Sequence, residues 1–91
     1  MMPSLYCRKN GQMILLKRYL EASMFDLEAQ VVAIGKRDGY PCAVMQGYRV
    51  ILKSKVLPNK VIITRDIEGA FPETKVYRMK VKKQKVVIQD V

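Results

Sequence analysis

The sequence has no histidine and no tryptophan, and it has only two cysteines among 91 residues. Histidine is the usual general acid or base near neutral pH. A structural zinc site needs about four Cys or His ligands at characteristic spacings, whereas this chain has only Cys7 and Cys42. We therefore expect no enzyme, no catalytic residue, no metal and no cofactor. The alternative that remains is a small nuclease-like or toxin-like protein that uses cationic groups.

Long apolar runs are also missing. No stretch approaches the roughly 18 apolar residues of a membrane span, and residues 1–8 contain no signal-peptide core. Two isolated cysteines favour buried thiols in a reducing compartment. With 49% apolar and 27% charged residues, the composition is that of an ordinary globular domain. We expect a single cytoplasmic domain over residues 1–91, without a membrane partner.

Turn signals divide the chain into short strand-like segments. Asn10-Gly11 suits a two-residue type I′ turn, which needs positive φ at both positions. Asp38-Gly39 is a second hairpin signal, and Pro58-Asn59 fits the centre of a type I or II turn. Strands are expected over residues 4–9, 12–17, 31–36, 40–46, 48–56, 61–65, 76–82 and 85–90.

One stretch between these strands has a helical period. Apolar residues recur there every three or four positions, at Leu16, Leu20, Met24, Leu27, Val31 and Ile34, as on one face of a helix. Because residues 31–34 are β-branched or small, we predict a short helix over about residues 19–29 that gives way to a strand. The alternative is a bent hairpin with its turn at residues 21–26.

These segments predict a mainly β fold. Short antiparallel strands joined by tight turns are typical of a small β-barrel or a two-layer sandwich, here with one short helix; the alternative is an α+β fold. In the strand at 76–82, Tyr77, Met79 and Val81 alternate with three cations. Such alternation places the apolar side chains in the core and the cations on the opposite face.

The 17 Lys and Arg residues outnumber the 8 Asp and Glu residues, which gives a formal net charge of +9. The cations gather in three blocks without an acid, at residues 1–20, 49–65 and 75–85. The acids lie mainly between these blocks. If the basic strands pair in one sheet, they form a positive face whose natural partner is a polyanion.

We therefore predict a basic nucleic-acid-binding domain of low sequence specificity that contacts phosphates of RNA or DNA. Tyrosines after glycines near basic residues add surfaces on which bases can stack. The expected contact residues are Arg8, Lys9, Arg37, Tyr40, Tyr48, Arg49, Lys53, Lys55, Arg78, Lys80 and Lys82.

A second prediction belongs to a different class. Three apolar segments, Met13–Leu16, Val50–Leu52 and Val61–Ile63, exceed what a small monomer covers easily. A protein–protein assembly or adaptor module that forms homo-oligomers through exposed strands would hide them. The sequence leaves open whether the polyanion is RNA, DNA or an acidic protein, and whether the three basic blocks share one face.

Overall fold

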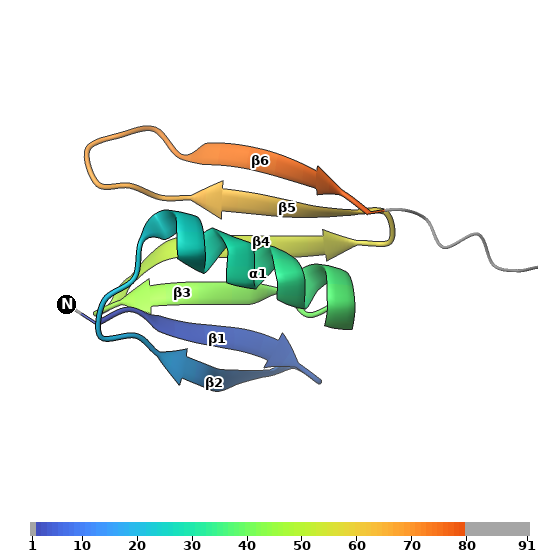
Figure 1. Cartoon of the computed structure of the whole chain (residues 1–91), viewed down its shortest axis with the longest axis horizontal. Helices are drawn as coiled ribbons and strands as arrows, with labels where there is room; N and C mark the ends of the chain where they lie inside the picture. Colours follow the sequence, from blue (N-terminus) through green and yellow to red (C-terminus); the bar gives the residue numbers. More distant parts are fainter. Residues whose placement is uncertain (1, 80–91) are drawn as a thin grey trace, which may run out of the picture.

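The computed structural model describes residues 2–79 of the chain. Within these residues, six strands form one antiparallel sheet and one helix lies between the second and third strands. Figure 1 shows how these elements are arranged. In chain order the elements are β1 (Ser4–Lys9), β2 (Gln12–Arg18), α1 (Met24–Asp38), β3 (Cys42–Gln46), β4 (Arg49–Leu57), β5 (Lys60–Arg65) and β6 (Glu73–Arg78).

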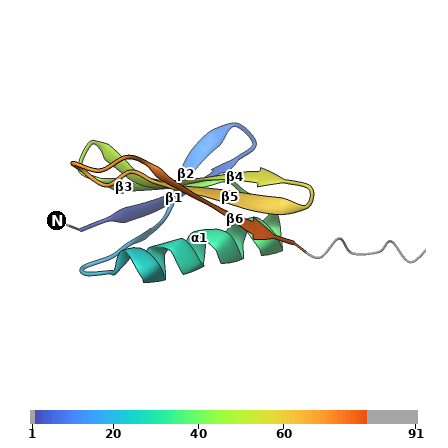
Figure 2. The ribbon, with the colours of Figure 1, turned by 90° about the horizontal axis from the view of Figure 1, so that it is seen from above.

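The strands lie in the order β2-β1-β3-β4-β5-β6. Figure 2 shows that α1 packs on one face of the sheet, while no other element of residues 2–79 covers the opposite face. The prediction of a small, mainly β domain with one helix is confirmed. The barrel alternative is wrong, because β2 and β6 lie at opposite edges of an open sheet. The two layers are a helix and a sheet, which is the α+β alternative.

The helix begins and ends later than predicted. It starts after Ser23, whose side-chain oxygen accepts a hydrogen bond from the Asp26 backbone N–H at 3.1 Å, as an N-cap does. It continues to Asp38, so the strand expected at 31–36 is wrong. Val31 and Ile34 face the core from the helix, and burial outweighs the weak strand preference of such residues.

Positive backbone φ angles occur at both of the turn signals that contain glycine, with different outcomes. Asn10 has φ 52° and Gly11 has φ 76°, which confirms the β1–β2 turn. Gly39 has φ 74°, but its N–H binds the Gly35 carbonyl at the end of α1. The Asp-Gly pair is therefore a helix C-cap and not a hairpin turn. The sequence signal was the same because both structures use the left-handed conformation.

The remaining turns and the last strand follow the sequence pattern. Leu57 pairs with Lys60 across the expected Pro58-Asn59 turn. Tyr77 and Met79 pack against the core, whereas Arg78 is exposed, as alternation predicts. Val81, Lys80, Lys82 and the strand expected at 85–90 lie outside the described residues.

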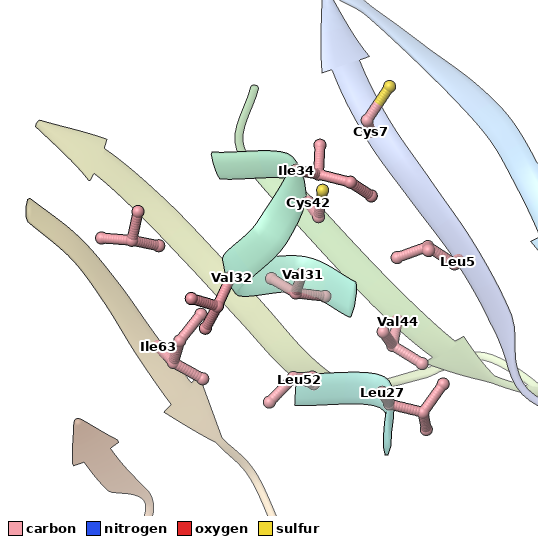
Figure 3. Close-up of a cluster of buried hydrophobic side chains, with 11 residues drawn as sticks. Leu5, Cys7, Leu27, Val31, Val32, Ile34, Cys42, Val44, Leu52 and Ile63 are labelled. Atoms are coloured by element: carbon pink, nitrogen blue, oxygen red, sulfur yellow. The ribbon is translucent and has the colours of Figure 1, made fainter. Parts of the chain in front are cut away.

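The core lies between α1 and the covered face of the sheet (Figure 3). Both cysteines are free and buried there, as predicted. Cys7 and Cys42 are directly opposite each other on β1 and β3. The fully or almost fully buried core residues are Leu5, Cys7, Leu27, Val31, Val32, Ile34, Cys42, Val44, Leu52, Val61 and Ile63.

The helix approaches the sheet closely at Gly35. A Cβ atom at this position would lie 2.9 Å from one methyl group of Val61 and 3.3 Å from a methyl group of Val56. Glycine has no Cβ atom and so avoids this steric overlap, which allows α1 to pack close to β4 and β5.

Candidate functional site

The strand register brings cations from distant parts of the chain to the uncovered face of the sheet. Residues directly opposite each other on antiparallel strands share a face. One row runs from Tyr6 through Ala43 and Lys53 to Thr64. We call this surface the open face; its cations are Arg8, Arg18, Lys53, Lys55, Lys60 and Arg78.

Apolar side chains fill the spaces between these cations. Several are strongly exposed, among them Met13 at 49%, Leu15 at 41% and Val76 at 51%. The apolar and aromatic residues of the open face are Tyr6, Met13, Leu15, Ala43, Met45, Val50, Leu57, Ile62 and Val76.

A bulge in β4 sets which residues of this strand reach the open face. Met45 pairs with Val50 but Val44 pairs with Leu52, so Ile51 is an extra residue. Ile51 and Leu52 both lie on the core side. From Lys53 onward the alternation is therefore shifted by one residue. The bulge places Val50 and Lys53 together on the open face.

No carboxylate among residues 2–79 lies among the cations of the open face. Asp66 borders the face beside Val50 and Lys53, and its carboxylate lies 3.5 Å from Arg49. None of the six open-face cations forms an ion pair with another described residue. The other carboxylates of the described chain lie on α1, next to it, in the β5–β6 loop, or at Glu73, which pairs with Arg65 on the helix side.

Two cations on the covered side, in contrast, are paired with a carboxylate of α1. Glu28 of α1 is only 5% exposed. It accepts hydrogen bonds from Arg65 Nε at 2.9 Å and from the Tyr77 hydroxyl, and it lies 3.6 Å from Lys75 Nζ. Burial alone would raise the pKa of Glu28, but the bonds from Tyr77 and Arg65 and the charges of Arg65 and Lys75 outweigh it and lower that pKa. The same hydrogen bond raises the pKa of Tyr77.

This network was not found in the sequence. Glu28 is 37 residues from Arg65 and 49 residues from Tyr77 along the chain, and no motif links them. A helix that covers a sheet can bury one of its polar residues, but the sequence does not indicate which residue of α1 is buried.

The predicted contact residues divide between the two sides. Arg8, Lys53, Lys55 and Arg78 lie on the open face, whereas Lys80 and Lys82 lie outside the described residues. Arg18, Lys60 and Tyr6 also lie on the open face and were missed. Only the strand register places these three residues on the open face, because Arg, Lys and Tyr occur at many exposed positions of a protein.

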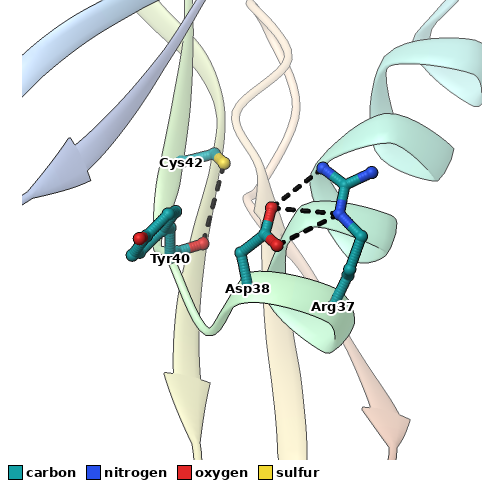
Figure 4. A network of polar contacts seen from close by, with 4 residues as sticks. All are labelled: Arg37, Asp38, Tyr40 and Cys42. Carbon is teal, nitrogen blue, oxygen red and sulfur yellow. Dashed lines mark hydrogen bonds and ion pairs between the residues drawn. The ribbon is translucent and has the colours of Figure 1, made fainter.

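Arg37 and Arg49 are held by carboxylates away from the open face. The Arg37 guanidinium contacts Asp38 at 2.8 Å at the end of α1 (Figure 4). This contact lowers the pKa of Asp38. Arg49 lies 3.2 Å from Glu68 of the β5–β6 loop. Neither arginine adds an unpaired charge to the open face.

Lys9, Tyr40 and Tyr48 also lie outside it. The Lys9 ammonium stands 5.6 Å from the centre of the Tyr40 ring, and this half-buried ring packs against the core. Tyr48 is fully exposed in the turn between β3 and β4. The structure therefore brings four of the predicted contact residues together and separates these three from them.

A metal site and a membrane-spanning helix have no support in the part of the chain that the structure describes. No group of three or more His, Cys, Asp or Glu side chains there is arranged to hold a metal. No helix in residues 2–79 has the length and apolar character needed to cross a membrane. Comparison of the chain with protein-family models, curated proteins and solved structures finds no match.

Proposed function

We propose that this protein binds nucleic acid through the phosphates that contact its open face. The observation that carries the proposal is that six cations lie on this face without a carboxylate partner in residues 2–79. Binding of phosphates by Lys and Arg releases counterions from the nucleic acid, which favours association and makes it sensitive to salt. No helix lies on this face in residues 2–79 to enter a groove and read base edges, so we expect low sequence specificity.

The test is a salt titration of binding with a charge-neutralised open face. Lys53→Gln with Lys55→Gln removes two central cations from β4. Affinity for a labelled mixed-sequence oligonucleotide should fall about tenfold or more at low salt. The slope of log K against log salt should fall by about 1.4 for a single strand, or about 1.8 for a duplex.

The matched control removes the same charge from the covered side. Lys17→Gln with Lys36→Gln takes two lysines whose ammonium groups stand over Tyr19 and Tyr77. This control should retain most of the affinity. Equal losses in the two double variants would show that only net charge matters, and a parent protein without affinity at low salt would refute the proposal.

Compartment and partner class belong to the same proposal. Two buried free thiols are in keeping with a reducing compartment such as the cytoplasm. RNA and DNA offer the same phosphate chemistry to the open face, so both must be tested.

Self-assembly is the second candidate, and exposure along β2 favours it. Met13, Ile14, Leu15 and Leu16 are 38–49% exposed on an edge strand. In the other two apolar segments, Leu52, Val61 and Ile63 are fully buried under α1, whereas Val50 and Ile62 lie on the open face.

Antiparallel pairing of β2 with β2 of a second copy would satisfy the edge. Centred at Leu15, it sets Lys17 against Met13 and Arg18 against Gln12, so no like charges face each other. Sedimentation of the nucleic-acid-free protein separates the candidates: an oligomer that is insensitive to salt and lost in Leu16→Lys supports assembly. A monomer in all salts refutes it.

A further inference from the structure

We infer that the open face selects single-stranded nucleic acid over duplex, with Tyr6 as the side chain on which a base stacks. This inference rests on the proposed function and specifies its ligand. It combines three observations about the open face: where its aromatic ring lies, which cations surround that ring, and how much apolar surface the cations leave between them.

Tyr6 is the one aromatic side chain among the strand residues of the open face in residues 2–79. It lies on β1, which is flanked by β2 and β3, and it is partly exposed. Its direct neighbours in the sheet are Leu15 on β2 and Ala43 on β3. Because alanine is small, the residue directly opposite Tyr6 on β3 leaves room beside the ring. A base can therefore pack against Tyr6 and lie over Ala43.

Two cations lie within reach of a nucleotide at this position. Arg8 follows Tyr6 by two residues and points to the same face. Lys53 lies in the same row as Tyr6, two strands away across Ala43, or about 10 Å at the usual spacing of strands. A base on Tyr6 thus places its flanking phosphates toward the guanidinium of Arg8 and the ammonium of Lys53.

The apolar surface distinguishes between ligands. A duplex turns its phosphates outward and keeps its bases stacked inside. On the open face such phosphates would be pressed against Met13, Leu15 and Val76, which offer no hydrogen bonds, and desolvation of charge without a partner is costly. A single strand presents unstacked bases to the same surface, and stacking on aromatic and apolar side chains is how such strands are held.

The competing ligand is a duplex that receives the β1–β2 hairpin. Figure 2 shows that this hairpin bends away from α1 at its tip. A two-stranded ribbon fits the major groove, so a duplex must be an arm of the experiment.

The experiment measures fluorescence anisotropy with three ligands of one mixed sequence: single-stranded RNA, single-stranded DNA and the matching duplex, each of about 16 nucleotides. The parent should bind one or both single strands at least tenfold more tightly than the duplex. Tyr6→Leu keeps a bulky strand-compatible residue but removes the ring. It should weaken single-strand binding about 5- to 100-fold and change duplex binding less than twofold.

Phe25→Leu is the matched control, because Phe25 is a 76% exposed aromatic on α1, on the other side of the sheet. It should bind like the parent. Lys53→Gln with Lys55→Gln should weaken binding of all three ligands, which separates the phosphate contribution from stacking.

Photocrosslinking of an oligonucleotide containing 4-thiouridine to the unaltered protein gives a second measurement that does not depend on the folding of a variant. An adduct at Tyr6 or its strand neighbours supports the inference, and adducts confined to α1 overturn it.

Three results distinguish the failures. Duplex binding as tight as single-strand binding, with Tyr6→Leu unchanged, overturns the inference but leaves the proposed function. No binding of any oligonucleotide at low salt overturns both. Displacement of the single strand by polyglutamate at equal charge concentration shows that any polyanion suffices, and it also overturns the inference.

Discussion

The two faces of the sheet carry cations from the same strands, but these cations differ in whether a carboxylate lies beside them. On β5, Arg65 turns toward α1 and binds Glu28, whereas Lys60 at the other end of the strand lies on the open face. On β6, Lys75 lies near Glu28, whereas Arg78 is exposed on the open side. On these two strands, the cations that face α1 have a carboxylate partner and the cations of the open face have none in residues 2–79.

This difference separates groups that hold the fold from groups that are free to bind. A buried charge without a partner is strongly destabilising, so the covered face requires the Glu28 network. Exposed cations contribute little to stability whether they are paired or not. The open face therefore keeps its charge at little cost to the fold, and its charge can be altered without unfolding the protein.

The largest expected effect is loss of the Glu28 carboxylate. Glu28→Ala leaves Arg65, whose side chain is 17% exposed, without its partner, and it removes the acceptor of the Tyr77 hydroxyl. The free energy of unfolding should fall by about 3–5 kcal/mol, measured by urea denaturation. Glu68→Ala, which removes an exposed partner of Arg49, should cost less than about 1 kcal/mol.

The same carboxylate predicts a dependence on acid. Its folded pKa lies below the ordinary value of 4.5, so its contribution is present above that pH and is lost as the pH falls through the lower folded value. A parent protein whose stability does not change between pH 5 and strongly acidic conditions would contradict this account of the covered face.

Alkaline pH should also act on the covered face, through Cys42. Burial, with smaller contributions from Cys7 and Asp38, raises the pKa of Cys42 from 9.0 to about 11. The unfolded chain loses this proton first, so stability is retained below pH 9 and falls as the pH rises toward 11. The loss is about 2 kcal/mol in size. Urea denaturation across this range should show a shallower decline in Cys42→Ala than in the parent.

Gly35 tests how closely the helix must approach the covered face. Alanine is the better helix former by about 1 kcal/mol, but its Cβ would lie 2.9 Å from a Val61 methyl group. Val61 is fully buried and β-branched, so it has little freedom to move. Gly35→Ala should therefore destabilise the protein by about 1 kcal/mol net, measured by urea denaturation. A more stable variant would show that α1 can move outward freely.

The sequence was informative where the pattern is local. The Asn10-Gly11 turn, the Pro58-Asn59 turn and the alternation around Tyr77 depend on neighbouring residues, and all three were predictable. The helix boundary was not, because Val31 and Ile34 suit a strand equally well until the sheet covers them. The Asp38-Gly39 pair was ambiguous for a similar reason, since a hairpin and a helix C-cap use the same φ.

The sequence predicted the open face only on the condition that the basic strands pair in one sheet. The three basic blocks were evident, but their meeting on one face depends on the strand order and on the bulge at Ile51, which no local signal marks. Arg49 and Lys53 belong to the same basic block, but Arg49 lies on the face of the sheet that α1 covers and Lys53 lies on the open face. Tyr6 was not among the predicted contact residues, because its neighbours Ala43 and Lys53 are far away in the chain.

The smallest expected effect on stability gives the most direct test of the difference between the two faces. Lys53→Gln with Lys55→Gln, proposed to weaken nucleic-acid binding, should change the free energy of unfolding by less than about 0.5 kcal/mol. The sign should be stabilising at low salt, because the remaining open-face cations repel each other less, and the gain should vanish as salt screens them. Urea denaturation at low and high salt measures both. A large loss of stability would mean that these lysines support the fold, and the two faces would then not differ in the way that their ion pairs indicate.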